Sequence, residues 1–422
     1  MIGGMTTARS LAWYRDASPE ARKALGAACL GWMLDSFDVN LYALVLASVM
    51  ADLGFDKSVA GLIGSFTLVT AAAGGILFGL AADRFGRTRA LIGSILIYSV
   101  FTGACGFAQT AGQLILFRAL LGIGMGGEWA SGAALVSETW PAEHRGKALG
   151  VVQSSWAVGY AAAAVVTQIV LPHWGWRAVF FVGVLPALAT AWVLKRVEEP
   201  RVWQAARARE AEGSAARRPA SAGLRTIFSG PMLKLTVFVT LMNACTLYGY
   251  WAFTQWVPAF LELPTARGGL GLGSYKTLLI VAMNVGMWFG YVTFGVVSDR
   301  VGRKRTYVTY VLAAAFFVMA YASLRSPMAL LLLGPLVGFF GAGYFSGFGA
   351  VTAEIYPTSI RATAQGFTYN LGRVASAAAP WVVGSLADSR GFAAAFATAA
   401  GAFVLAAVAW IWIPETRGRV IE

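Results

Sequence analysis

The chain has 422 residues, of which 58% are hydrophobic and only 13% are charged, and it contains 15 Trp and 26 Phe. A soluble protein of this length could not bury so much apolar surface around one core, so the composition excludes the ordinary soluble class. A net charge of +13 would suit a nucleic-acid partner, but the basic residues cluster in short segments between long apolar runs, a pattern typical of membrane proteins.

Twelve apolar runs are each long enough to cross a hydrocarbon core of about 30 Å as a helix of about 20 residues. The polar residues 1–23 precede them as a predicted cytoplasmic arm, and we expect no cleavable signal peptide. The runs of the first half (24–195) are 24–50, 58–82, 90–108, 112–137, 146–170 and 176–195. The runs of the second half (231–413) are 231–261, 276–298, 306–323, 327–355, 362–387 and 391–413. A linker at 196–230, expected to be helical near Trp203–Glu210, and a tail at 414–422 complete the chain.

A charged hinge between two apolar runs occurs twice. The segment GLAADRFGRTR at 79–89 returns as GVVSDRVGRKR at 295–305, with Asp83, Gly86 and Arg87 each repeated 216 positions later. The pattern Glu-x-x-Pro-x-x-x-Arg at 138–145 returns at 354–361 with the same offset. Two unrelated signals with one offset indicate a duplicated membrane unit whose two copies run parallel.

The positive charges predict the orientation of these spans. Segments assigned to the cytoplasm contain 25 Lys or Arg, whereas the opposite loops contain six, namely Lys57, Arg177, Arg267, Lys276, Arg325 and Arg390. Because cytoplasmic loops carry the basic excess and the number of spans is even, both termini are expected inside the cell.

Several patterns that would suggest other chemistry do not fit their surroundings. Gly122-x-Gly124-x-x-Gly127 has the letters of a dinucleotide fingerprint but lies in an apolar helix, where small residues allow close helix packing. The run GGLGLG at 268–273 is expected to be a flexible external connector. No phosphate-binding G-x-x-x-x-G-K-[ST] occurs, and the three cysteines have no metal-ligand spacing. We therefore predict no cofactor, no metal site and no ATP-driven pump or enzyme.

With both hinges placed, Asp83-Arg84-x-Gly86-Arg87 and its repeat resemble the signature of the major facilitator superfamily, and Arg118-x-x-x-Gly122 is similar to that superfamily's second motif. The resemblance implies an all-α membrane fold of twelve helices, in two six-helix bundles around a central cavity that opens alternately to each side. Three segments resemble the sialate and monocarboxylate proton symporters and the related aromatic-acid permeases: LDSFDVNLYALVL at 34–46, GIGMGGEWASGAALVSETWP at 122–141 and GWRAVFFVGVLP at 175–186.

Charged residues inside apolar runs are costly unless paired or hydrated, so each is a candidate functional residue. Asp35 and Asp38 lie three residues apart on one helical face, and Glu128 lies deep in the fourth run. Because neighbouring carboxylates repel when both are ionised, we predict that Asp35, Asp38 and Glu128 couple transport to protons, with structural pairing or hydrogen bonding as the alternative. Arg373 is predicted to grip a substrate carboxylate with its planar guanidinium, and Arg118 either binds substrate or pairs with an acid.

Other polar residues are assigned by position. Candidates to line the cavity, each of which could equally be a packing residue, are Gln153, Tyr160, Asn243, Tyr248, Gln255, Trp256, Asn284, Tyr369 and Asn370. Residues at the cytoplasmic rim are predicted gate contacts: Asp83, Arg84, Gly86, Arg87, Glu138, Arg145, Asp299, Arg300, Gly302, Arg303, Glu354 and Arg361.

The sequence thus predicts a monomeric secondary transporter of the inner (plasma) membrane that imports a small organic acid anion by proton symport. Its partners are the anion, protons and the lipid bilayer, and no nucleic acid. An aromatic-acid or sialic-acid permease, a sugar porter and a drug/proton antiporter remain alternatives, as do a facilitator without proton coupling and a membrane receptor. Arg373 argues against a cationic drug, and the doubled hinge argues against a receptor that needs no alternating gate.

Overall fold

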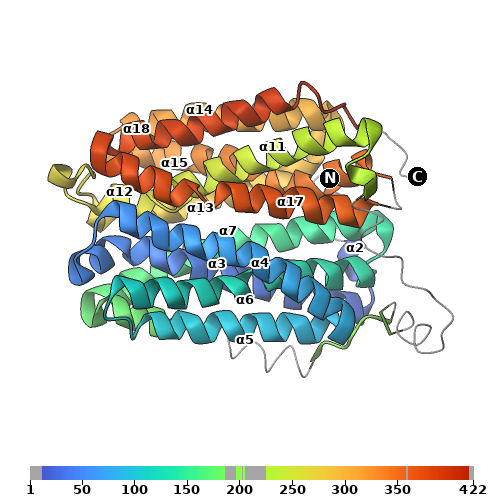
Figure 1. Ribbon diagram of the computed structural model, residues 1–422, viewed down its shortest axis with the longest axis horizontal. Coiled ribbons are helices and arrows are strands. Elements are labelled where there is room, and N and C mark those ends of the chain that lie inside the picture. Colours follow the sequence, from blue (N-terminus) through green and yellow to red (C-terminus); the bar gives the residue numbers. More distant parts are fainter. Residues whose placement is uncertain (1–11, 186–195, 202, 205–224, 358–359, 418–422) are drawn as a thin grey trace, which may run out of the picture.

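The computed structural model describes residues 12–185, 196–201, 203–204, 225–357 and 360–417. The regular elements among these residues are all helices, as expected where no water is present to satisfy free backbone N–H and C=O groups. The helices run along the long axis of the molecule in two groups (Figure 1). The N-terminal helices, coloured blue to green, form one half, and the C-terminal helices, coloured yellow to red, form the other.

The N-terminal half contains α2 (Ala12–Arg15), α3 (Pro19–Leu53), α4 (Lys57–Phe85), α5 (Arg87–Cys105), α6 (Ala111–Thr139) and α7 (Ala142–Val182). Helix α3 begins five residues before the predicted start of the first span, because Ser18 accepts a hydrogen bond from the Ala21 N–H and Pro19 occupies the first helical position. The predicted polar arm is therefore partly helical within the described residues.

The C-terminal half contains α11 (Gly230–Thr254), α12 (Val257–Glu262), η1 (Thr265–Arg267), η2 (Gly273–Tyr275), α13 (Lys276–Val301), α14 (Arg303–Ser323), α15 (Pro327–Ala342), α16 (Phe345–Ile355), α17 (Arg361–Ser376) and α18 (Ala379–Ala409). The predicted seventh span divides into α11 and α12, and the tenth into α15 and α16. Most of the predicted linker lies outside the described residues.

Ten helical segments of the described chain are long and apolar enough to cross a membrane, and two of them accommodate two predicted spans each. Helix α7 contains Gly175 at φ 73°, and α18 contains Gly391 at φ 81°, both in a non-helical conformation. Gly175 falls between the predicted spans 146–170 and 176–195. Gly391 falls at the start of the predicted span 391–413. They reverse the chain without a long loop, so the fold has the twelve helices that were predicted, with 186–195 outside the described part.

The sequence repeat is reproduced in the backbone. Gly86 and Gly302 adopt nearly the same conformation, φ 115° and ψ 154° against φ 114° and ψ 148°, and each joins one helix directly to the next. Gly175 and Gly391 are also 216 positions apart. In each half a glycine lies against a carbonyl of a neighbouring helix: Gly122 against Thr67, and Gly338 against Met283. The two glycines are again 216 positions apart, and so are the two residues whose carbonyls they meet. The packing of the two halves is therefore duplicated along with their sequence.

We use two names for the ends of the molecule. The motif end is the end that carries Gly86 and Gly302. The far end is the opposite end, where α4 begins at Lys57 and where α12 lies, on the left in Figure 1. At the far end, the run 268–273 is not the flexible connector that was predicted. Leu270 N–H donates to Phe260 O at 2.8 Å, and Leu272 N–H donates to Leu261 O at 2.7 Å. These backbone hydrogen bonds fix the loop against α12.

The duplicated glycine conformation predicts a specific sensitivity to substitution. Gly302→Ala should lower the free energy of unfolding by about 1–3 kcal/mol, because a side chain rarely adopts this positive φ. Gly295→Ala is the matched control: Gly295 belongs to the same hinge segment but lies within helix α13, and a Cβ added there would meet no atom within 4 Å. Thermal unfolding in detergent, followed for both variants, checks the difference. Equal midpoints would contradict it.

Candidate functional site

In the described part of the chain, six charged side chains are buried, and five of them form the candidate site, the sixth being Lys276 at the far end. Asp35 and Asp38 come from α3, Arg118 and Glu128 from α6, and Arg373 from α17, and each is at most 3% exposed. The three acids and Arg118 therefore belong to the N-terminal half, whereas Arg373 belongs to the C-terminal half. A charge in a dry interior is costly unless it has a partner, so their arrangement determines what the site can do.

Asp35 and Arg373 attract each other electrostatically across the interface between the halves. Neither carboxylate oxygen of Asp35 has a hydrogen-bond partner among the described residues, and neither does Arg373 Nε. The two side chains are thus opposed without being joined by a direct hydrogen bond. This arrangement leaves hydrogen-bonding capacity on both groups for a proton, water or an anion.

Asp38 and Arg118 are also buried in the N-terminal half, and the charge of Asp35 repels that of Asp38. The Thr102 hydroxyl donates to Asp38 Oδ2 at 3.3 Å, and the Arg118 guanidinium lies 4.6 Å from the centre of the Tyr42 ring. Arg118 also attracts Asp38 electrostatically. Arg118 Nε and Nη1 have no hydrogen-bond partner among the described residues, so both roles predicted for Arg118, substrate binding and pairing with an acid, stay predictions.

Glu128 is the third buried acid of the N-terminal half, after Asp35 and Asp38. Both of its carboxylate oxygens are buried without a hydrogen-bond partner in the described part of the chain. Its charge repels that of Asp35, and a Cβ on Gly31 of α3 would collide with its carboxylate. Glu128 therefore lies against the same helix as the two aspartates.

A cavity of about 20 Å³ opens at the interface of the halves and contains Arg373. Its walls are Trp32, Gln153, Trp156, Leu247, Tyr250, Trp251, Tyr291, Phe345, Tyr369 and Arg373, contributed by α3, α7, α11, α13, α16 and α17. This volume holds about one water molecule, so the walls must separate before an organic molecule enters. Seven of the ten lining residues are aromatic, so any molecule bound there would contact mostly ring faces and edges.

The aromatic wall crosses from one half to the other. Trp32 and Trp156 have ring centres 4.7 Å apart, and Trp156 meets Trp251 of the other half at 6.3 Å. Trp156 Nε1 donates a hydrogen bond of 2.7 Å to the Tyr250 hydroxyl. This buried hydrogen bond ties α7 to α11 beside the cavity.

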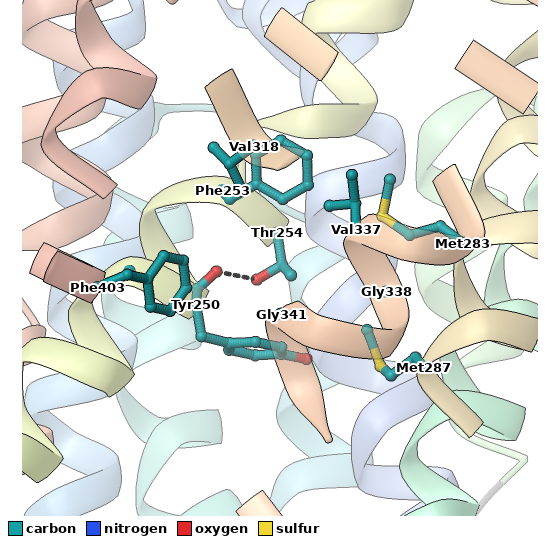
Figure 2. A pocket seen from close by; sticks show the side chains of 11 residues that line it. Tyr250, Phe253, Thr254, Met283, Met287, Val318, Val337, Gly338, Gly341 and Phe403 are labelled. Carbon is teal, nitrogen blue, oxygen red and sulfur yellow. Dashed lines mark hydrogen bonds between the residues drawn. The ribbon is translucent and has the colours of Figure 1, made fainter. Parts of the chain in front are cut away.

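Tyr250 also lines a second cavity, of about 10 Å³, inside the C-terminal half (Figure 2). Phe253, Met283, Met287 and Phe403 surround it, and the Thr254 hydroxyl is occupied by a 2.7 Å hydrogen bond to Tyr250 O. The lining of this space is apolar, which makes it a packing void rather than a binding site. Tyr250 thus lines both cavities.

The predicted lining residues divide into two groups. The structure brings Gln153 and Tyr369, together with Arg373, into the wall of the interface cavity. The others lie elsewhere and contact the protein itself: Tyr160 donates to Thr254 O, Tyr248 to Thr398, Trp256 to Pro380 O, Asn284 to Ile280 O and Asn370 to Gly366 O, while Asn243 and Gln255 are buried. The sequence analysis did not select Trp32, Trp156, Trp251, Tyr291 or Phe345, because an aromatic residue in an apolar run looks the same whether it faces a cavity or a neighbouring helix.

The predicted gate residues form two equivalent ion pairs at the motif end. Arg87 Nη2 lies 2.8 Å from Glu138 Oε1, and Arg303 Nη2 lies 3.0 Å from Glu354 Oε1. Each pair joins residues of the same half. Arg303 also contacts Asp299 at 2.6 Å. Arg84, Arg145 and Arg300 are exposed, and the side chains of Asp83 and Arg361 lie outside the described part.

Two acids at this end were not predicted. Glu199 accepts the Thr88 and Arg89 backbone N–H groups at the start of α5, and Glu415 accepts those of Arg303 and Lys304 at the start of α14. Burial opposes ionisation of Glu415, but these N–H donors outweigh it and hold the pKa of Glu415 below its usual value. Glu199 and Glu415 are also 216 positions apart, and this shared offset is the signal that could have found them.

Comparison with known proteins agrees with this architecture. Residues 28–274 and 268–421 match the family model described as Major Facilitator Superfamily. A protein of Cupriavidus pinatubonensis named "Probable 4-methylmuconolactone transporter" is 34% identical, covering 97% of this chain and 94% of that protein. The sialic acid transporter NanX of Escherichia coli is 31% identical, covering 87% and 88%. The partially occluded, inward-open xylose transporter XylE of E. coli is similar in structure, with a TM-score of 0.76 over 96% of this chain and 100% of that chain, at 19% identity.

The matched family model spans nearly the whole chain, and the duplicated hinges, the two halves and the interface cavity are those of a transporter rather than an enzyme. The chain is a multi-pass membrane transporter of the major facilitator superfamily.

Proposed function

We propose that this transporter imports a planar, aromatic or unsaturated carboxylate together with protons, by alternating access of the interface cavity. The observation that carries the proposal is one guanidinium, Arg373, in the wall of a cavity that is otherwise mostly aromatic.

The anion is supported by the state of Arg373. Its side chain is buried, and its Nε has no hydrogen-bond partner among the described residues. A guanidinium presents parallel N–H groups that match the two oxygens of a carboxylate, and such charge-assisted contacts are stronger than neutral hydrogen bonds. A cationic substrate would meet repulsion at the same position, which argues against a drug antiporter.

The planar substrate is supported by the remaining walls. Trp32, Trp156 and Trp251 offer ring surfaces for stacking, while Gln153 and the tyrosine hydroxyls are the polar partners besides Arg373. A sugar or a sialic acid carries several hydroxyls, and each one left without a partner on burial would weaken binding. One relative is named for 4-methylmuconolactone and another for sialic acid, and the aromatic walls of this cavity favour a substrate with few hydroxyls.

Proton coupling is supported by the acids opposite Arg373. Asp35 attracts Arg373 across the interface and repels Glu128, and none of the carboxylate oxygens of these two acids has a hydrogen-bond partner in the described part. In the proposed cycle a proton neutralises Asp35, which frees Arg373 to receive the substrate carboxylate. Release of the substrate on the other side restores the attraction and expels the proton.

We further propose that the motif end faces the cytoplasm of an inner (plasma) membrane, since the predicted cytoplasmic segments carry the basic excess. Residues 24–195 and 231–413 are then two units joined by a cytoplasmic linker at 196–230, with both termini inside and a monomer as the working unit.

Coupling is tested with purified transporter in proteoliposomes and a panel of benzoate-like, muconate-like, sialic and sugar substrates, with and without an inward proton gradient. We expect the parent to accumulate a planar carboxylate only with the gradient. At least one of Asp35→Asn and Asp38→Asn should still bind this substrate but fail to concentrate it, since an amide cannot carry the proton. Accumulation by both variants at the parental level would show that these acids are structural.

Arginine geometry is tested by Arg373→Lys, which retains the positive charge but loses the planar fork. We expect the variant to bind the carboxylate about 10- to 100-fold more weakly, which corresponds to roughly 1–3 kcal/mol for a charge-assisted hydrogen bond. Its melting temperature should change little. Isothermal titration and thermal unfolding of the same preparation measure both quantities. Parental affinity combined with a large loss of stability would mean that Arg373 holds the fold rather than the substrate.

The proposed gate at the motif end is tested by comparing Glu354→Gln with Asp299→Asn. Glu354 is 12% exposed and receives Arg303 and the Thr416 hydroxyl, whereas Asp299 is 64% exposed. The first substitution should slow transport more than the second, since the shielded pair is the stronger contact. Substrate affinity should remain close to the parental value in both. A large loss of affinity at an unchanged rate would place Glu354 at the substrate instead.

A further inference from the structure

The far end contains a charged contact between the halves that the cavity and the motif-end pairs do not involve. Lys57 Nζ, at the first position of α4, lies 2.9 Å from Asp388 Oδ1 of α18. The second oxygen of Asp388 accepts the Ser58 backbone N–H at 3.1 Å. The hydroxyls of Ser58 and Ser385 lie 3.0 Å apart beside it. One carboxylate of the C-terminal half thus binds both a side chain and the backbone of the N-terminal half.

This contact completes the N-terminal cap of α4. The first N–H groups of a helix have no partner within it and together carry partial positive charge. Asp56, the capping residue, accepts the Val59 N–H at 2.8 Å, and Asp388 takes the Ser58 N–H. Two carboxylates therefore accept N–H groups at the start of α4: Asp56 from the same half and Asp388 from the opposite half. If the halves separate here, Ser58 and Lys57 lose their partner together.

Other contacts join the two halves besides that of Asp388. The Lys276 ammonium donates to Leu44 O of α3 at 2.9 Å and pairs with Glu262 at 2.7 Å. The Trp381 N–H donates to Ser65 Oγ of α4 at 3.2 Å. Gly384 lies against the Lys57 carbonyl so closely that a Cβ would collide with it. The two halves are therefore in backbone contact at the far end, and this side of the interface cavity is shut.

We propose that Asp388 is a far-end latch, which holds the cavity closed on this side by binding Lys57 and the α4 N-terminus, and which releases both when the transporter opens there. The proposal rests on the alternating access of the proposed function. Asp388 makes these contacts only in the closed arrangement, so removing its charge favours the open one. The Lys57 and Asp388 side chains are 12% and 33% exposed. Water can reach the pair, so the contact is weak enough to break in every cycle.

The chain provides a matched control at the same end. Asp52 Oδ2 lies 2.7 Å from Arg177 Nη1 and also accepts a hydrogen bond from Trp176 Nε1 at 3.1 Å. Both partners belong to the N-terminal half, through α3 and α7. Asp52→Asn therefore removes a far-end carboxylate charge of similar exposure without touching the interface between the halves.

The test measures conformation rather than transport. Spin labels on cysteines at Gln109 and Ser326, exposed positions at the far ends of the two halves, report the opening by pulsed electron–electron distance measurement, with the three native cysteines replaced. We expect Asp388→Asn to raise the fraction of molecules with a longer distance about fivefold or more. Asp52→Asn should match the parent. An unchanged distribution in Asp388→Asn, or an equal change in Asp52→Asn, would overturn the latch.

A charge swap separates the two contacts of Asp388. Lys57→Asp combined with Asp388→Lys restores an ion pair but places a cation at the α4 N-terminus, where only an acceptor binds the Ser58 N–H. We expect the swap to restore closure only in part, and full restoration would overturn the capping half of the latch. Because the readout needs no substrate, failure of every organic acid in the uptake panel would overturn the proposed function while leaving the latch result standing.

Discussion

A hydrocarbon interior does not solvate charge, and this constraint governs the centre of the molecule. Asp35, Glu128 and Arg373 are buried with carboxylate and guanidinium atoms that lack hydrogen bonds in the described chain. The acids are fixed to one half and the arginine to the other, so their attraction depends on how the halves meet. A proton on the acid or an anion on the arginine changes that attraction directly. In the proposed function, the same charges that are costly to bury link ligand binding to the relative position of the halves.

Ion pairs within one half occur at both ends of the molecule, and the far end also has one between the halves. At the motif end, Arg87 with Glu138 and Arg303 with Glu354 join helices of the same half. At the far end, Asp388 joins opposite halves. Pairs within a half keep each bundle rigid, whereas pairs between halves are made or lost when the bundles move. The rigid bundles and the breakable contacts are both needed for a fixed site to be exposed first to one side and then to the other.

In the proposed function, the aromatic cavity selects the substrate. Trp156 and Tyr250 come from different halves and share a hydrogen bond beside Arg373. A substrate that separates them must replace that hydrogen bond and the ring contacts. A planar carboxylate offers a ring face and an anion, which are the two kinds of contact that the walls present.

The sequence by itself determined the class, the twelve spans, the duplication and the charged candidates, because hydropathy, charge and a fixed offset are properties of the chain order. It also identified Gln153, Tyr369 and Arg373, since polar groups in apolar runs are conspicuous. Only the tertiary structure decided which aromatic residues face the cavity, that 268–273 is fixed against α12, and that Asp388 caps α4. Which aromatic residues face the cavity depends on helix rotation, and the loop depends on backbone hydrogen bonds to α12. The cap of α4 joins residues 330 positions apart. An apolar face toward lipid and one toward a cavity have the same composition, and no spacing along the chain distinguishes them.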